Sequence, residues 1–370
     1  NKIGGVRGGM VLAAETIERE VFPNLKLNGI VDVSFAGFIR VVDALGCAYV
    51  NVDHRYLHVN NGTPEENYSE INLQPGYQKL CYENALSYVR YRHDDSDFVR
   101  VARQQDFIRD LREQISPGNE IGQIDTVAKT VGHAIVSTFH NSASELIELA
   151  KLIVFSQGKP LRQVPFQRSD VNYKFGEGSY VTSTPALERA TLTEFLQGNQ
   201  RVHLPRPSRP AHRSAHTHQH STSLTPASLG LFATSHAGVS EMIKAAVNIP
   251  FGVLYPSLQT GQATQQEVHP YTLEDQQNHL HHAYTVVWRQ NINGGYYDFE
   301  GSDWTSPPLF AHAHTQQIDG RAFMLIDDGE HIHVIGWRSH NVLYWLTNTL
   351  LEELSNPQMI AIARSASAPH

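Results

Sequence analysis

Apolar residues along the first part of the chain alternate between two spacings. Residues 11–20, 83–91 and 97–114 carry apolar side chains three or four positions apart, as an amphipathic helix does. Residues 29–32 and 48–52 are short runs rich in Val, Ile and Tyr, which favour strands. This alternation predicts an α/β fold up to about residue 200, in which a sheet is flanked by helices.

Three further helices and two strands are expected in the second half of this part. Helical spacing covers about 121–140 and 143–156, and another helix is expected to end at Leu196. Short apolar runs predict strands near 164–166 and 179–182. Residues 1–200 are therefore predicted to form one layered domain.

The pattern breaks at residues 201–226. Pro, Arg and Ser alternate there, and four histidines follow within a few positions, at His212, His216, His218 and His220. A polar, proline-containing stretch of this kind cannot build a core, so it predicts a linker. The histidines are interpreted as part of the composition bias, although such a tract can chelate metal weakly.

Periodicity returns over residues 227–370. A strand is expected at 284–288, and a hairpin turn at 293–297 leads into the next strand. A second hairpin is expected around Asp327-Asp328-Gly329, and a helix over 344–353. These elements predict a small α+β module.

Composition narrows the class of protein. The 370 residues carry a net charge of −8, which argues against nucleic acid as a partner. No apolar run reaches the roughly 18 residues that a membrane span needs. The chain starts at Asn1 rather than Met, and we expect any targeting segment to lie upstream.

The candidate chemistry concentrates in residues 88–105. Four arginines and three aspartates fall within fourteen positions at a predicted turn between two helices: Arg90, Arg92, Arg100 and Arg103 with Asp94, Asp95 and Asp97. Guanidinium groups match phosphate oxygens two at a time, and an aspartate at a helix start can cap the helix or help to hold Mg²⁺. The alternative is a set of salt bridges on a solvated helix pair.

The order of residues decides between these interpretations. Leu73, Pro75-Gly76, Leu80, Ala85-Leu86, Tyr88, Arg90, Arg92, Asp97, Arg100 and Arg103-Gln104 follow one another in a pattern that resembles the signature of the LytR-CpsA-Psr family. Upstream, residues 35–38 and 42–46 resemble the segment before the family's Gly-Gly, and Cys47 replaces the second Gly. Lys2-Ile3 and Gly8-Gly9 also resemble the family, with Gly4 where Asn is usual. The resemblance covers about residues 1–200.

The resemblance implies an extracytoplasmic enzyme, anchored to the membrane by a helix that would precede Asn1. Such enzymes use Mg²⁺ to transfer a glycopolymer from a polyprenyl diphosphate carrier to peptidoglycan, with phosphotransferase chemistry. The family's earlier Asp-Arg and Pro-Arg-Asp motifs would also precede Asn1, so we expect this chain by itself to bind poorly or not to turn over. The alternative function is a non-catalytic binder of polyprenyl phosphate or wall polymer with a regulatory role.

Site roles follow from the same resemblance. Arg92, Arg100 and Asp97 match catalytic positions, and Asp97 and Asp94 are the candidates for the metal. The candidates for diphosphate binding are Arg90, Arg92, Arg100, Arg103, Gln104 and Lys2. The two cysteines, Cys47 and Cys81, are compatible by count with a disulfide or with free thiols. The oxidising compartment implied by the resemblance favours the disulfide.

Two other groups of residues are candidates for chemistry. His312 with His314, and His331 with His333, each place two imidazoles on one face of a strand, a geometry that can bind zinc. With no acidic or cysteine partner at ligand spacing, we interpret them as surface or cross-strand histidines. Aromatic residues of the C-terminal module can stack on sugars, but an aromatic core is the simpler interpretation: Trp288, Trp304, Trp337, Trp345, Tyr296 and Tyr297.

Overall fold

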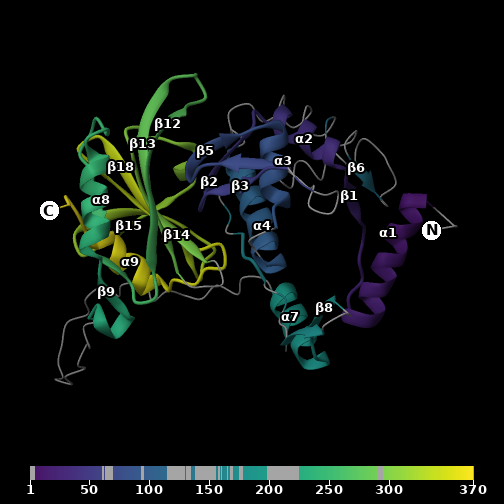
Figure 1. The fold of residues 1–370 in the computed structure, drawn as a ribbon. Helices are drawn as coiled ribbons and strands as arrows, with labels where there is room; N and C mark the ends of the chain where they lie inside the picture. The colour runs from purple at the N-terminus through teal and green to yellow at the C-terminus, as the bar shows by residue number, and fades with distance from the viewer. Residues whose placement is uncertain are drawn as a thin grey trace, which may run out of the picture. The chain divides into compact units, whose positions relative to one another are not determined.

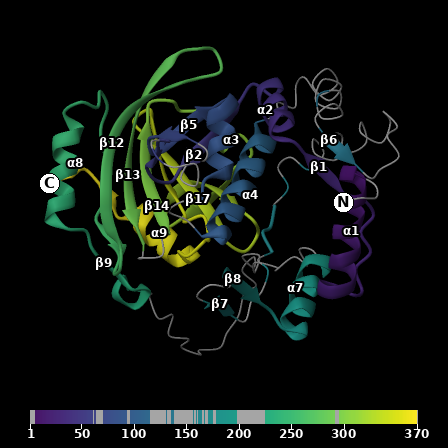
Figure 2. The same ribbon diagram turned by 45° about the vertical axis from the view of Figure 1, so that its right-hand side comes forward.

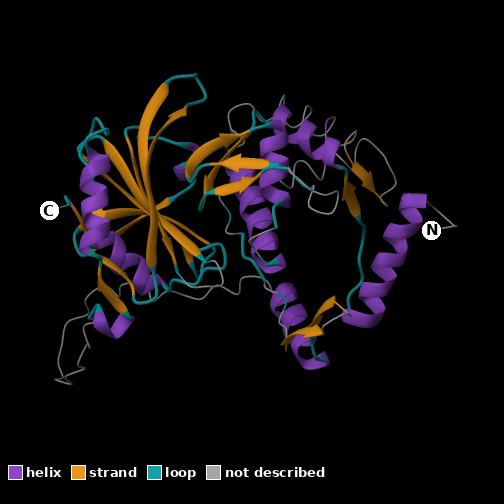
Figure 3. Ribbon diagram, in the orientation of Figure 1, coloured by secondary structure: helices purple, strands orange, loops and turns teal. Residues whose placement is uncertain are grey.

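The computed structural model describes residues 5–60, 62, 70–92, 96–114, 130, 135–137, 156, 159, 161–164, 166, 170–174, 178–197, 225–290 and 295–369 (Figure 1). By its internal contacts the chain forms two compact units. One joins Asn1–Gly46 with Ile115–Arg201, and the other joins Cys47–Gln114 with Val202–His370. These boundaries differ from the expected ones, because residues 47–114 group with the C-terminal part of the chain. Both units mix helices and strands (Figure 3), as the predicted fold class requires.

The described residues of the first unit form three helical segments and two small sheets. Helix α1 (Gly5–Thr16) continues into a π-helical turn, η1 (Ile17–Val21), and α2 (Phe35–Ala44) begins after Ser34, whose side chain accepts a hydrogen bond from the Gly37 N–H. The remaining elements are β1 (Val31–Val33) paired with β6 (Ile135–Ser137), the hairpin of β7 (Asp170–Lys174) and β8 (Gly178–Thr182), and α7 (Pro185–Gln197).

Of the elements expected in this unit, some are wrong, some are confirmed, and some lie outside the described residues. The helix expected over 121–140 is contradicted at Ile135–Ser137, which form a strand because they pair with β1. The described residues near 164–166 form no strand. The expected strand at 179–182 and the helix ending at Leu196 are confirmed, to within a few residues, by β8 and α7. The helix over 143–156 and the linker over 201–226 lie outside the described residues, except for the last residue or two of each.

The second unit begins with a small α/β segment. Strand β2 (Ala48–Val52) pairs with β5 (Gly76–Leu80), and β3 (Tyr56–His58) pairs with β4 (Ile71–Leu73), all antiparallel. Helices α3 (Tyr82–Arg90) and α4 (Asp97–Glu113) follow.

The predicted disulfide is present and joins Cys47 to Cys81, with 4.8 Å between their Cα atoms. These residues lie one position beyond the Ala48–Leu80 pair, so the bridge closes one end of the β2–β5 ladder. Closing a loop of this length stabilises the fold by roughly 3–4 kcal/mol in the chain-entropy model.

A seven-stranded antiparallel sheet is the largest part of the second unit. Its strand order is β12-β13-β14-β18-β17-β16-β15. The bounds are β12 (Thr264–Glu274), β13 (Leu280–Arg289), β14 (Tyr296–Ser302), β15 (His314–Ile318), β16 (Arg321–Asp327), β17 (Ile332–Ser339) and β18 (Val342–Thr347). Smaller elements are β9 (Leu231–Ala233) paired with β11 (Leu258–Thr260), β10 (Tyr255–Pro256) paired with β19 (Ala366–Ser367), and the 3₁₀ turns η3 (Ala227–Leu229) and η4 (Pro308–Phe310).

The sheet is covered on both faces. Helices α8 (His236–Ala246) and α9 (Asn356–Arg364) lie along one face (Figure 2), where Met242 and Met359 join the main apolar core. On the other face, Tyr49 of β2 and Tyr77 of β5 pack in a second cluster with Trp345. The predicted aromatic core is confirmed, because Trp288, Trp337 and Trp345 are each 1% exposed and Trp304 is 8% exposed.

The helix expected over 344–353 is wrong. Residues 342–347 form β18, which pairs with β14 on one side and β17 on the other. A short apolar run that is buried on both faces carries no alternation, so spacing alone does not separate a strand from a buried helix. Among the described residues, no helix is both long and apolar enough to cross a membrane.

Candidate functional site

The arginine-rich segment forms the end of α3, the turn after it and the first turn of α4. Ser96 caps α4: its backbone is extended, and its hydroxyl accepts a hydrogen bond of 3.3 Å from the Val99 N–H. The expectation that Asp97 is the cap is therefore wrong, because Asp97 is already the first helical residue. An acidic side chain in this first turn interacts favourably with the helix dipole.

Asp97 brings two of the arginines together. Its Oδ1 lies 3.3 Å from Nε of Arg92 and 3.4 Å from Nη2 of Arg100. Arg92 and Asp97 are mostly exposed, and the Arg100 side chain is 30% exposed, with an Nε that is buried and has no hydrogen-bond partner in the described part of the chain. Arg90, the last residue of α3, is exposed on the same segment. Among the described residues of this segment, three arginines that are exposed or partly exposed thus lie near the carboxylate of Asp97.

Arg103 and Gln104 occupy a layer beneath this surface. Arg103 is fully buried, and its Nη1 donates to the carbonyls of Tyr88 (3.3 Å) and Tyr91 (2.8 Å). Gln104 donates from Nε2 to the carbonyl of Val89 at 2.9 Å. These carbonyls belong to the last turn of α3, where intrahelical partners run out. The Arg-Gln pair therefore fixes the end of α3 against α4 and so the position of the turn.

A buried acidic group completes the lower layer. The Tyr56 hydroxyl donates to Oδ1 of Asp53 at 2.6 Å and accepts a hydrogen bond from Arg103 Nε at 3.2 Å. His54 Nδ1 lies 3.2 Å from Asp53 Oδ2. Burial by itself would raise the pKa of Asp53, but His54, Arg103 and the Tyr56 hydroxyl together hold that pKa below its ordinary value. Asp53 thus stays ionised and neutralises the buried guanidinium.

Sequence reasoning did not single out Asp53, His54 and Tyr56. The available signal was the polar run Asp53-His54-Arg55 directly after the predicted strand 48–52, a position where buried charge is unexpected. Of the predicted site residues, Arg92, Asp97 and Arg100 come together, while Arg103 and Gln104 lie behind them. Lys2 and Asp94 lie outside the described residues.

The Asp97 carboxylate suits Mg²⁺ only if substrate phosphate also binds the ion. Mg²⁺ is usually bound through one or two carboxylates, with substrate phosphates and water completing its shell. Asp97 offers one carboxylate, and its Oδ1 is shared between two guanidinium groups that would themselves turn to phosphate oxygens. The residues therefore fit an ion that arrives with a diphosphate.

Comparison with known proteins places this segment in context. The LytR_cpsA_psr family model matches residues 4–194, more than half of the chain. Residues of the chain are 29% identical over 130 positions to the polyisoprenyl-teichoic acid–peptidoglycan teichoic acid transferase TagU of Halalkalibacterium halodurans, covering 35% of this chain and 39% of that protein. They are 30% identical over 168 positions to the cell wall biosynthesis protein LcpA of Corynebacterium glutamicum, covering 45% of this chain and 30% of that protein.

The chain thus spans about a third of the length of these curated relatives. Among solved structures, Bacillus subtilis TagV is similar with a TM-score of 0.41 and 22% identity, covering 52% of this chain and 72% of that one.

Proposed function

Because the chain belongs to the LytR-CpsA-Psr family, we propose that it is a Mg²⁺-dependent phosphotransferase that moves a glycopolymer from a polyprenyl diphosphate carrier to peptidoglycan, outside the cytoplasmic membrane. The observation that carries the proposal is the meeting of Arg92, Asp97 and Arg100 at the start of α4. The similarity to a teichoic acid transferase and to a cell wall biosynthesis protein supports it.

The arginines would bind and neutralise the diphosphate. A guanidinium fork pairs with two phosphate oxygens and keeps its charge at all physiological pH values, so Arg92 and Arg100 stabilise the negative charge that grows on the phosphoryl group. The buried Nε of Arg100 has no hydrogen-bond partner in the described part of the chain, so this donor is not committed to another group there. Arg90 lies near enough in sequence to extend the cationic surface along the carrier.

The transfer itself needs positioning more than a protein nucleophile. A peptidoglycan hydroxyl attacks the sugar-bearing phosphorus, its proton passes to water, and the broken P–O bond leaves its electron pair on polyprenyl phosphate. Asp97 would hold Mg²⁺, which supplies charge stabilisation at the phosphate oxygens. Arg103 and Gln104 act as positioning residues, because they hold the turn that carries Arg92 and Asp97.

The experiment is cleavage of a short polyprenyl diphosphate sugar by this chain, with and without Mg²⁺, beside Arg92→Ala and Asp97→Ala. The matched control is Arg364→Ala, which removes an exposed arginine paired with Asp319 at 2.5 Å on the same unit. We expect metal-dependent turnover that both site variants reduce by at least about 100-fold and that the control leaves unchanged.

If this chain shows no turnover, the assay is repeated with a longer chain that includes any natural residues preceding Asn1. Turnover only in the extended chain supports the proposal, because family motifs are expected there. Continued silence, with binding of polyprenyl phosphate that survives Asp97→Ala, overturns the enzyme and leaves the non-catalytic binder.

A further inference from the structure

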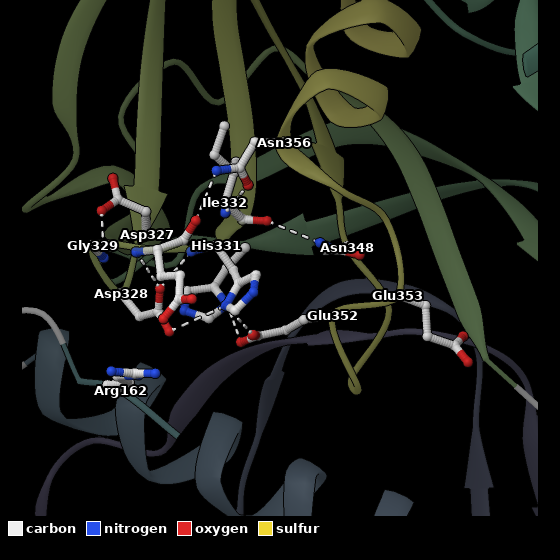
Figure 4. Close-up of polar contacts among 12 residues, drawn as sticks. Arg162, Asp327, Asp328, Gly329, His331, Ile332, Asn348, Glu352, Glu353 and Asn356 are labelled. Atoms are coloured by element: carbon white, nitrogen blue, oxygen red, sulfur yellow. Dashed lines mark hydrogen bonds and ion pairs between the residues drawn. The ribbon is translucent and has the colours of Figure 1, made fainter. Parts of the chain in front are cut away.

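Two loops of the second unit bring histidine and carboxylate side chains to one point, away from the α3–α4 turn. Asp328 lies in the turn between β16 and β17, His331 lies just before β17, and Glu352 lies between β18 and α9 (Figure 4). One ligand atom from each of the three lies within 4.8 Å of the others. The spacing of residues in the sequence did not reveal this set, because Glu352 is far from His331 along the chain.

The distances suit a tetrahedral ion. His331 Nδ1 lies 3.1 Å from Oε2 of Glu352 and 3.6 Å from Oδ2 of Asp328. Zinc bonds to nitrogen and carboxylate oxygen of about 2.0–2.1 Å place neighbouring ligands of a tetrahedron roughly 3.3 Å apart. The two distances bracket this edge, and the two carboxylate oxygens lie within 4.8 Å of each other. Small side-chain rotations would therefore bring the three ligand atoms around one ion.

His333 gives a second, independent sign of a ligand site. The residue is 5% exposed, and its Nδ1 lies 2.8 Å from Oε1 of Glu352. His333 Nε2 and Glu352 Oε1 are both buried and have no hydrogen-bond partner among the described residues. A histidine at this distance can orient one carboxylate oxygen, which leaves the other oxygen for a metal. This is the usual arrangement of an outer shell that orients a ligand.

The loops are held in place before any ion binds. Buried Asn348 donates to the carbonyls of Ile332 (3.0 Å) and Leu354 (2.9 Å), and Asn356 Oδ1 accepts from the Ile332 N–H at 2.8 Å. Asp328 uses Oδ1 to accept the N–H groups of Glu330 and His331, which directs Oδ2 toward the cluster. The ligand atoms therefore need little ordering on binding.

Charge also favours a cation. The side chain of Asp328 is 1% exposed, and that of Glu352 is 14% exposed. Two buried or half-buried carboxylates thus face one another across His331.

We propose that Asp328, His331 and Glu352 bind a zinc-class divalent transition ion, with His333 orienting Glu352. The imidazole ligand discriminates against Mg²⁺ and Ca²⁺, which prefer all-oxygen shells. The ion ties the β16–β17 turn to the segment after β18, and three protein ligands leave a fourth tetrahedral position for water. This site shares no residue with the proposed diphosphate site, so it goes beyond the proposed function.

The test is zinc titration of the metal-stripped full chain by calorimetry, with Co²⁺ absorption as a spectroscopic readout of the ligand shell. The variants are His331→Ala and Glu352→Gln, with His333→Gln as the outer-shell variant. The matched control is His314→Ala. Like His331, His314 is about half exposed and lies beside a carboxylate, that of Asp327 at 3.2 Å, but it is not part of the proposed site. All variants keep the histidines of residues 201–226, so weak chelation there is a common background.

We expect one tight site in the parent chain and the control, with intense tetrahedral Co²⁺ bands and a melting temperature raised by zinc. His331→Ala and Glu352→Gln should weaken that site by at least about 10-fold and abolish the bands, and His333→Gln should weaken it by about 10-fold. Equal zinc affinity in the parent chain and in folded His331→Ala would overturn the proposal. Co²⁺ bands typical of six oxygen ligands would also overturn it, because they would show that no histidine binds the ion.

Discussion

Arg92 and Arg103 show how burial divides one residue type between two tasks. Arg92 is mostly exposed and lies beside Asp97, whereas Arg103 is fully buried among Tyr56, Tyr88 and Tyr91. The Arg103 guanidinium also lies over the Tyr56 ring, 4.8 Å from its centroid. Sequence alone assigned both to phosphate, because side-chain type carries no information on depth.

The first prediction concerns these two arginines. Arg103→Ala should lower the free energy of unfolding by about 3–5 kcal/mol, because it leaves α3 carbonyls without donors and Asp53 without its buried cation. Arg92→Ala should change it by no more than about 0.5 kcal/mol, as is usual for an exposed side chain. Urea unfolding followed by circular dichroism measures both, and equal losses would show that depth does not separate them.

At the scale of elements, β14 carries a pair of acids into the interior. Asp298 and Glu300 point to the same face of the strand and lie beneath β2 and β5, where Asn51 donates to Asp298 at 2.9 Å. Glu300 accepts from the Tyr77 N–H at 3.1 Å and from Trp345 Nε1 at 3.2 Å. Burial raises the pKa of Glu300 to about 7, and burial with the charge of Glu300 raises that of Asp298.

The second prediction is the pH dependence that follows from Glu300. Because its pKa is higher in the folded state than in the unfolded chain, the folded protein keeps a proton that the unfolded chain releases. The resulting stabilisation is fully present below the unfolded pKa and is lost as pH rises through about 7. It amounts to something on the order of 3 kcal/mol.

Glu300→Gln should remove this part of the pH slope, because the amide does not titrate. The measurement is the free energy of unfolding at about pH 5 and about pH 7.5 for both proteins. A slope that is identical in parent and variant would show that Glu300 ionises in the fold as it does in water.

At the scale of the whole molecule, the second unit is assembled from two distant stretches of chain. Tyr49 of β2 donates from its hydroxyl to the Glu274 carbonyl at 2.9 Å, and Leu309 donates its N–H to the Tyr77 hydroxyl at 3.0 Å. The family match ends at residue 194, yet the packing of β2 and β5 depends on strands beyond residue 225. The C-terminal module therefore takes part in the fold of the site-bearing segment.

The third prediction tests this dependence by cutting the chain within the predicted linker. Trypsin is expected to cleave after Arg201 and Arg213, since proline follows Arg206 and Arg209. The two large fragments should elute together from a size-exclusion column under native conditions and separately in urea, because non-covalent contacts hold residues 47–114 to the sheet. Separate elution of a folded C-terminal fragment under native conditions would contradict the assembly.

The sequence by itself determined the family, the α/β character, the strand 48–52, the helices at 83–91 and 97–114 and the arginine cluster. These depend on local spacing and on the order of residue types, which are properties of the chain alone. Only the tertiary structure decided that 342–347 is a strand, that Arg103 is buried, and that Glu352 meets His331. The physical reason is that burial on both faces, depth and contacts between distant segments arise from packing, and no local pattern encodes them.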